Sequence, residues 1–192
     1  MKEEKKIAVL FPGIGYTNER PLLYYAKKLA QKQGFDILPL NYTGFQNPKD
    51  VIGKAGALKA SFELAYTQSE DILQDVNWKE YSRILFISKS VGTAAAAAYA
   101  KRHALQTENI YYTPVEGTFL FMREKSGIAF HGTADPWADN AMVEENCRRF
   151  SIPLYVTEHG NHSLETGDVL KDIDQLKQIM SETEAYITRE DA

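Results

Sequence analysis

The chain has 192 residues, of which 44% are hydrophobic and 25% charged, a balance typical of a folded globular domain. Its net charge of −4 comes without a basic stripe, so neither nucleic acid nor an anionic membrane is an expected partner. A single cysteine, Cys147, excludes an internal disulfide. Together with the lack of a signal-peptide core near Met1, this composition favours a cytoplasmic protein.

Short apolar runs alternate with amphipathic segments along the whole chain. The runs predict strands at residues 7–11, 35–40, 84–87, 110–112, 127–131 and 154–157. The intervening segments predict helices at residues 21–33, 56–76, 91–103, 138–150 and 164–187. Strands that are apolar throughout are covered on both faces, which indicates a parallel sheet between two helical layers. We therefore expect one α/β domain over residues 1–192, a three-layer αβα sandwich with about six mostly parallel strands.

Parallel sheets of this kind carry their functional groups in the loops at the carboxyl ends of the strands. The third predicted strand runs directly into Ser88-Lys89-Ser90-Val91-Gly92, and a predicted helix follows at once. A serine flanked by small residues two positions away on either side is typical of a sharp strand-to-helix turn that exposes its hydroxyl. This pattern makes Ser90 the candidate nucleophile.

Two other strand-end loops supply the partners that a serine nucleophile needs. Asp135 follows the fifth predicted strand, and both His159 and His162 follow the sixth. A hydroxyl needs a base to take its proton, and the base needs a carboxylate to fix its tautomer. The order Ser90, Asp135, His162, with spacings of 45 and 27 residues, predicts a triad, and His159 is the alternative base.

These motifs resemble those of the small, lid-less α/β-hydrolases near dienelactone hydrolase and the prolyl-oligopeptidase-type catalytic domains. The matching segments are residues 7–15, 88–92, 131–135 and 160–163. The resemblance implies Ser90 as nucleophile, Asp135 as acid and His162 as base. It also implies an oxyanion hole formed by the N–H groups of Val91 and Ile14.

The chain departs from the family pattern at two positions. Ser88 stands where glycine is usual, and Phe11 stands where the first loop often begins with histidine. Ser88 is still small enough for the turn, whereas the change at Phe11 leaves Gly13 or Gly15 as alternatives to Ile14 in the oxyanion hole.

The resemblance further implies a strand order of 2-1-3-4-5-6 and no lid, because residues 114–127 are too few to form one. The expected activity is that of a carboxylesterase-like serine hydrolase, which cleaves an ester or thioester of a small substrate through an acyl-enzyme on Ser90. Neither a metal nor an organic cofactor is expected. The competing hypothesis is a non-catalytic binding module with the same fold.

Several residues near these loops are candidates for substrate binding. They are Gly13, Gly15, Tyr16, Lys89 and Trp137. Lys89 has two interpretations, a contact with an acidic group of the substrate or a solvent-exposed surface lysine. The sequence leaves the natural substrate and the oligomeric state open, and a homo-oligomer is compatible with it.

Two other site types share residues with these loops. A metal site could combine His159 and His162 with nearby carboxylates at Glu158, Glu165 and Asp135, although the usual zinc-binding spacings are missing.

The second alternative is a dinucleotide-binding loop at Pro12-Gly13-Ile14-Gly15. It fails because Asn18 replaces the third glycine and Asp36 begins a strand instead of ending one.

Overall fold

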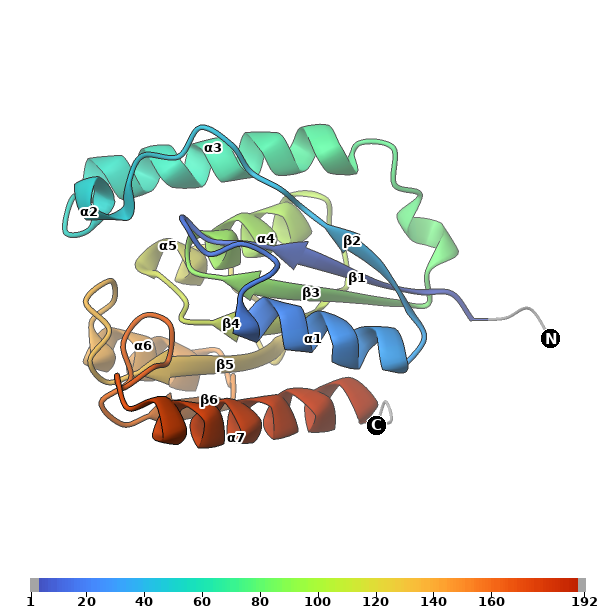
Figure 1. Cartoon of the computed structure of the whole chain (residues 1–192). Helices are drawn as coiled ribbons and strands as arrows, with labels where there is room; N and C mark the ends of the chain where they lie inside the picture. Colours follow the sequence, from blue (N-terminus) through green and yellow to red (C-terminus); the bar gives the residue numbers. More distant parts are fainter. Residues whose placement is uncertain (1–3, 190–192) are drawn as a thin grey trace.

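The computed structural model describes residues 4–189, which form one six-stranded sheet with helices on both faces (Figure 1). The strands are β1 (Lys6–Phe11), β2 (Phe35–Pro39), β3 (Arg83–Lys89), β4 (Glu108–Tyr112), β5 (Gly127–Gly132) and β6 (Leu154–Thr157). The helices are α1 (Pro21–Lys32), α2 (Pro48–Val51), α3 (Ala55–Leu73), α4 (Val91–Arg102), α5 (Glu116–Phe119), α6 (Asn140–Arg149) and α7 (Val169–Thr188), with a 3-10 helix, η1, at Trp78–Glu80. The expected domain limits at residues 1 and 192 lie outside the described range.

The strand order is β2-β1-β3-β4-β5-β6, and every neighbouring pair is parallel. This confirms the predicted strand order and the predicted αβα sandwich. Because all strands point the same way, the loops after β1, β3, β4, β5 and β6 meet at one edge of the sheet.

Successive residues of each strand face opposite helical layers. Ala8 and Leu10 of β1 pack in the core beneath α1 and α7, whereas Val9 and Phe11 pack in the core beneath α3 and α4. Figure 1 shows α1 and α7 on one side of the sheet and α3 and α4 on the other. This two-sided burial explains why the strands read as continuous apolar runs.

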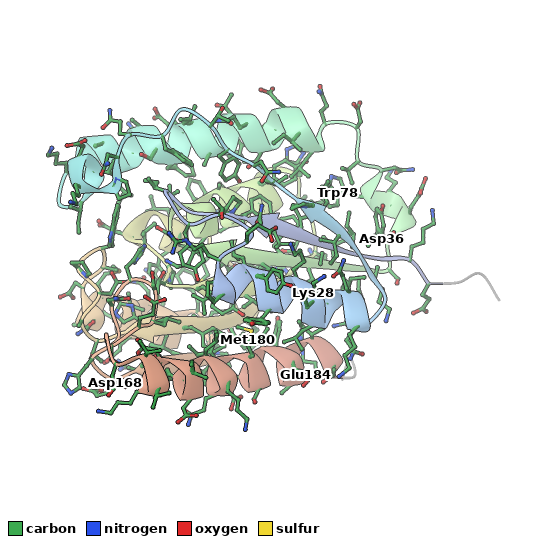
Figure 2. The ribbon with its side chains drawn as sticks, viewed as in Figure 1. Lys28, Asp36, Trp78, Asp168, Met180 and Glu184 are labelled. Atoms are coloured by element: carbon green, nitrogen blue, oxygen red, sulfur yellow. The ribbon has the colours of Figure 1, made fainter. Side chains whose placement is uncertain are left out.

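The helices α1 and α7 are held together by both apolar and charged contacts. Figure 2 shows Met180 and Glu184 on the side of α7 that faces α1. Met180 packs against the core, and the Lys32 Nζ lies 3.0 Å from the Glu184 Oε1. The Lys32 side chain is largely exposed and that of Glu184 is partly exposed, so this ion pair adds little stability compared with the apolar contact.

The helices differ from the sequence prediction at several ends, and α6 begins at Asn140 instead of residue 138 because the Asp139 carboxylate caps it by accepting from the Met142 N–H. The last helix begins at Val169 instead of residue 164, because the Asp168 carboxylate caps it by accepting from the N–H groups of Leu170 and Lys171. The helix α3 ends at Leu73, three residues before the predicted end. The single-turn helices α2 and α5 are too short to give a periodic pattern, and the sequence therefore did not predict them.

The segment between β4 and β5 holds only α5, a single helical turn. This confirms the expectation that no lid domain is inserted there. Within residues 4–189, no helix has both the length and the apolar character needed to cross a membrane.

The central helix α4 packs unusually close to the sheet. Its residues from Val91 to Tyr99 are all buried, and five of them form the alanine run Ala94–Ala98. A Cβ added at Gly92 would lie only 2.2 Å from the Phe11 carbonyl oxygen and 2.4 Å from that of Pro12. Glycine at this position is therefore what lets α4 begin directly under the loop that follows β1.

We predict that Gly92→Ala lowers the free energy of unfolding by about 2–3 kcal/mol, because the added methyl group must displace the backbone. Gly56→Ala is the matched control: it is also a helical glycine, but nothing lies within 4 Å of the added Cβ. For Gly56→Ala we expect the free energy of unfolding to rise by up to about 1 kcal/mol, because alanine has a higher helix propensity than glycine. Urea unfolding measures both changes, and equal effects of the two substitutions would contradict the packing argument.

Candidate active site

Ser90 lies on the turn between β3 and α4 in a backbone conformation that non-glycine residues rarely adopt. Its φ is +57° and its ψ is −128°. The Ser90 N–H donates to the Tyr112 carbonyl at 3.0 Å, and the Ser90 carbonyl accepts from the Thr93 N–H at 2.9 Å and the Thr93 Oγ1 at 2.5 Å. These bonds to the neighbouring strand and to the first turn of α4 hold the strained residue in place.

The residues around this turn are small, as the sequence pattern requires. Ser88 is fully buried, and its Oγ donates to the Ile110 carbonyl at 3.1 Å. A Cβ at Gly13 would lie 2.9 Å from the Ser90 Cβ, so the loop after β1 depends on a glycine here to pass beside Ser90. Gly13 therefore helps to form the turn from a distant part of the chain.

Three side chains from separate strand-end loops form one hydrogen-bonded chain. The Ser90 Oγ lies 2.7 Å from the His162 Nε2, and the His162 Nδ1 lies 2.9 and 2.8 Å from the two Asp135 carboxylate oxygens. Because a carboxylate only accepts hydrogen bonds, Nδ1 is the donor in this pair. In the neutral imidazole, Nε2 is then free to accept the Ser90 hydroxyl proton.

The Asp135 carboxylate is fully buried and held by several donors. Its Oδ1 also accepts from the Trp137 N–H at 2.8 Å. Burial alone would raise the pKa of Asp135, but the hydrogen bond from His162, the charge of this imidazole when it is protonated, the Trp137 N–H and the charge of Lys89 together lower it below its usual value. Asp135 is therefore ionised at neutral pH.

His162 is kept neutral by its surroundings. Burial is the main cause that lowers its pKa, to about 4, and the positive charge of Lys89 contributes, while Asp135 acts in the opposite direction. The indole of Trp137 stacks on the imidazole, with ring centres 5.1 Å apart and an angle of 22° between the planes. The ring is thus fixed between Asp135 and Trp137 with its Nε2 directed at Ser90.

Lys89, the residue before Ser90, is fully buried, so the interpretation as a surface lysine is wrong. Its Nζ donates to the Thr113 Oγ1 at 2.6 Å and lies 5.0 Å from the centre of the Tyr16 ring. The Thr113 Oγ1 donates in turn to the His162 carbonyl at 3.3 Å. Burial lowers the pKa of Lys89 to about 7, and the charges of Asp135 and Glu165 oppose this shift.

The five candidate substrate-binding residues fall into different environments. Gly13 lies against Ser90, and Trp137 lies against His162. Tyr16 belongs to the core on the α1 side, and its hydroxyl accepts from the Leu22 N–H at 3.1 Å. Lys89 is buried beside Tyr16, and Gly15 is exposed. Gly13 and Trp137 are therefore the two that lie directly beside the Ser90–His162 pair.

The N–H groups of the two residues predicted for the oxyanion hole have no hydrogen-bond acceptor within the described part of the chain. Among residues 4–189, neither the Ile14 N–H nor the Val91 N–H donates a hydrogen bond. The Gly13 N–H is already used, because it donates to the Tyr16 carbonyl at 3.1 Å. This excludes Gly13 as a free donor and leaves Ile14 and Gly15 as the candidates from that loop.

The alternative base, His159, is exposed and takes no part in the Ser90 chain. Its backbone has a φ of +59°, and its N–H donates to the Thr133 Oγ1 at 2.7 Å. In the part of the chain that the structure describes, no three His, Cys, Asp or Glu side chains are grouped to hold a metal ion. The alternative metal site around His159 and His162 is therefore not formed.

Sequence reasoning missed the supporting residues behind the Ser90 chain. The His131 Nε2 donates to the Asn140 Oδ1 at 2.7 Å, because the Asn140 amide itself donates to the Thr133 carbonyl and so fixes its orientation. The His131 Nδ1 lies 3.9 Å from the Asp135 Oδ2 and is buried without a hydrogen bond in the described part of the chain. Thr113 directly follows a predicted strand, and this position at the same sheet edge as Ser90 was the signal that could have placed it near the site.

Neither a family model nor a curated protein sequence matches this chain. Solved structures do. A protein of unknown function from Agrobacterium tumefaciens, described as an α/β hydrolase, is 20% identical, with a TM-score of 0.65 over 98% of this chain and 87% of that chain.

Two further structures are similar over most of their length. A serine hydrolase without a lid from Xanthomonas campestris is 13% identical, with a TM-score of 0.61 over 100% of this chain and 88% of that one. An esterase from Pyrococcus furiosus is 12% identical, with a TM-score of 0.60 over 96% of this chain and 84% of that chain. The chain therefore has the α/β-hydrolase fold, in the small form that lacks a lid.

The buried position of Lys89 leads to a prediction about His162. We predict that Lys89→Met raises the pKa of His162, because a positive charge that disfavours the imidazolium is removed while the side-chain volume is nearly kept. NMR titration of the imidazole measures this pKa. Lys171→Met, on the exposed surface of α7, is the control, and we expect it to leave the pKa of His162 unchanged. An unaltered pKa in Lys89→Met would contradict the electrostatic link.

Proposed function

We propose that the protein is a carboxylesterase-like serine hydrolase that cleaves esters or thioesters of small substrates through an acyl-enzyme on Ser90. The observation that carries this proposal is the hydrogen-bonded chain from the Ser90 Oγ through His162 to Asp135. A serine, a histidine and a carboxylate in this arrangement have the geometry of a catalytic triad, and the strained turn at Ser90 is that of a nucleophile elbow.

In the first half of the reaction, the Ser90 Oγ attacks the acyl carbon while its proton moves to the His162 Nε2. The carbonyl double bond opens, and the resulting oxyanion accepts from the N–H groups of Val91 and Ile14. When the carbonyl re-forms, the bond to the leaving oxygen or sulfur breaks. The leaving group takes the proton from the His162 Nε2 and departs as an alcohol or thiol.

In the second half, water replaces the leaving group. The His162 Nε2 takes a proton from the water as its oxygen attacks the acyl carbon, and a second oxyanion forms at the same two N–H groups. The bond to the Ser90 Oγ then breaks, and the Oγ recovers the proton from His162. The products are a carboxylic acid and the free enzyme.

The electrostatics of the site support these roles. A base must be neutral before it accepts a proton, and the lowered pKa of His162 meets this requirement at neutral pH. The ionised Asp135 stabilises the imidazolium that forms during the reaction. The short α5 segment leaves this sheet edge without a lid, which favours small substrates that arrive directly from solvent.

The esterase activity named for the Pyrococcus furiosus structure is in keeping with this proposal. We also propose a cytoplasmic location, because the only cysteine of the chain, Cys147, is a buried apolar residue that gains nothing from an oxidising compartment.

The proposal predicts that a fluorophosphonate probe modifies the wild-type protein once, by forming a phosphorus–oxygen bond to the Ser90 Oγ with loss of fluoride. Intact-mass spectrometry detects the adduct, and peptide mapping locates it. Ser90→Ala removes the nucleophile and gives no adduct, whereas Ser163→Ala, which changes another serine near His162, keeps it.

Two outcomes would overturn this proposal. An adduct that persists in Ser90→Ala would assign the nucleophile elsewhere. A folded wild-type protein without any adduct, and without turnover of p-nitrophenyl acetate, would favour a non-catalytic binding module with the same fold.

A further inference from the structure

An apolar groove opens between the amino-terminal half of α3, the first turn of α4 and the α5 segment. Its volume is about 380 Å³, within the range of small-molecule sites. Figure 1 shows the start of α3 and α5 at the end of the sheet toward which the strands point, where the Ser90 turn lies. Its apolar lining includes Leu58, Phe62, Val91, Ala94, Leu120 and Phe121.

The groove is lined at one point by the residue next to the proposed nucleophile. Val91 directly follows Ser90, and Ala94 lies on the next turn of α4. In the proposed acyl-enzyme, the carbonyl oxygen faces the Val91 N–H. The acyl chain therefore leaves the Ser90 Oγ next to the residue that forms this part of the groove, and the small Ala94 leaves room for the chain to continue.

The walls further out come from segments that are far apart in the sequence. Phe62 of α3 stacks on Phe121, with ring centres 5.6 Å apart and an angle of 20° between the planes. Leu120 is 70% exposed at the rim, and its carbonyl accepts from the Lys101 Nζ at 3.1 Å, which ties the segment after α5 to α4. Two helices of one layer, α3 and α4, thus form an apolar surface together with the α5 segment, and this surface includes Val91, the residue after Ser90.

The chemistry of the groove discriminates between acyl groups. Lys59 and Glu116 are the charged residues among those that line it, and both are exposed. A sugar, a peptide or a hydroxylated ring bound here would lose hydrogen bonds to water and find few partners. A hydrocarbon chain has no hydrogen bonds to water to lose, and its binding here is favoured because it removes apolar surface from water.

We propose that this groove binds the acyl chain of the substrate, so that the natural substrates are esters or thioesters of linear, medium-length fatty acids. The inference rests on the proposed serine hydrolase function. Each buried methylene group improves binding by roughly four-fold. At about 30 Å³ for each water-sized group, the groove volume of about 380 Å³ holds about twelve groups, so a chain of about six to eight carbons fits with room to spare.

The test compares p-nitrophenyl acetate, butyrate, hexanoate and octanoate. For the wild type we expect kcat/KM to rise by about ten-fold or more from acetate to hexanoate, since four further methylene groups are partly buried. The ratio of hexanoate to acetate turnover is the quantity to follow, because it cancels changes in the amount of active enzyme.

Two variants alter the groove in different ways. Gly117→Leu fills it: a Cβ at Gly117 lies 3.7 Å from the Ala94 Cβ, an ordinary contact, so the longer side chain occupies the groove. Leu120→Asp places a charge at the exposed rim with little effect on folding. Both should lower the hexanoate-to-acetate ratio by about ten-fold. Leu170→Asp, on a leucine of α7 that is 74% exposed, is the matched control and leaves the ratio unchanged.

The outcomes separate this inference from the function on which it rests. If the wild type hydrolyses acetate but shows no gain with chain length, or if both folded groove variants keep the wild-type ratio, the groove is not the acyl site while the hydrolase proposal stands. If the wild type hydrolyses none of the esters and a fluorophosphonate does not label it, both proposals fail.

Discussion

The strand-to-helix turn at Ser90 constrains most of the structure around it. The strained backbone costs about 1–3 kcal/mol, and bonds to Tyr112 and Thr93 hold it. The turn brings α4 so close to the sheet that only glycine fits at Gly92, and it brings the β1 loop so close that only glycine fits at Gly13. The alanine run of α4 and the course of the β1 loop therefore follow from the placement of one serine.

The second requirement is a balanced set of buried charges behind that serine. Asp135 is a fully buried carboxylate, and such a group is stable only when donors surround it. His162 and the Trp137 N–H supply them, and the charge of Lys89 also favours the ionised carboxylate. The same lysine holds Thr113, which contacts the His162 loop. Charge and position of the imidazole are thus set by one buried cluster.

Much of the fold could be predicted from the sequence because the four central strands, β1, β3, β4 and β5, are buried on both faces and read as continuous apolar runs. The edge strands β2 and β6 are partly exposed but still mostly apolar. The order of Ser90, Asp135 and His162 at strand ends indicated which side chains meet. The start of α7 was harder, because the loop before Asp168 contains residues that also suit a helix.

Of the two interpretations of Lys89, the exposed surface lysine is wrong; full burial was not expected because lysine is rarely buried without a partner. Its place in the alternation of β3, on the same face as Leu85 and Ile87, was the available signal. The apolar groove could not be predicted, because its walls come from α3 and α5, which meet only in the folded chain. Local patterns report burial, whereas grooves between distant elements depend on how helices pack.

The central claim is that Ser90 and His162 act as one unit, and a double-mutant cycle on ester hydrolysis tests it most directly. The account predicts that Ser90→Ala and His162→Ala each lower kcat/KM by about a thousand-fold or more, and that the double variant is no slower than either one. In the parallel cycle, adding His159→Ala to the wild type or to the Ser90→Ala variant changes kcat/KM by no more than about two-fold. Losses that multiply in the Ser90–His162 cycle, or a large loss from His159→Ala, would contradict the account.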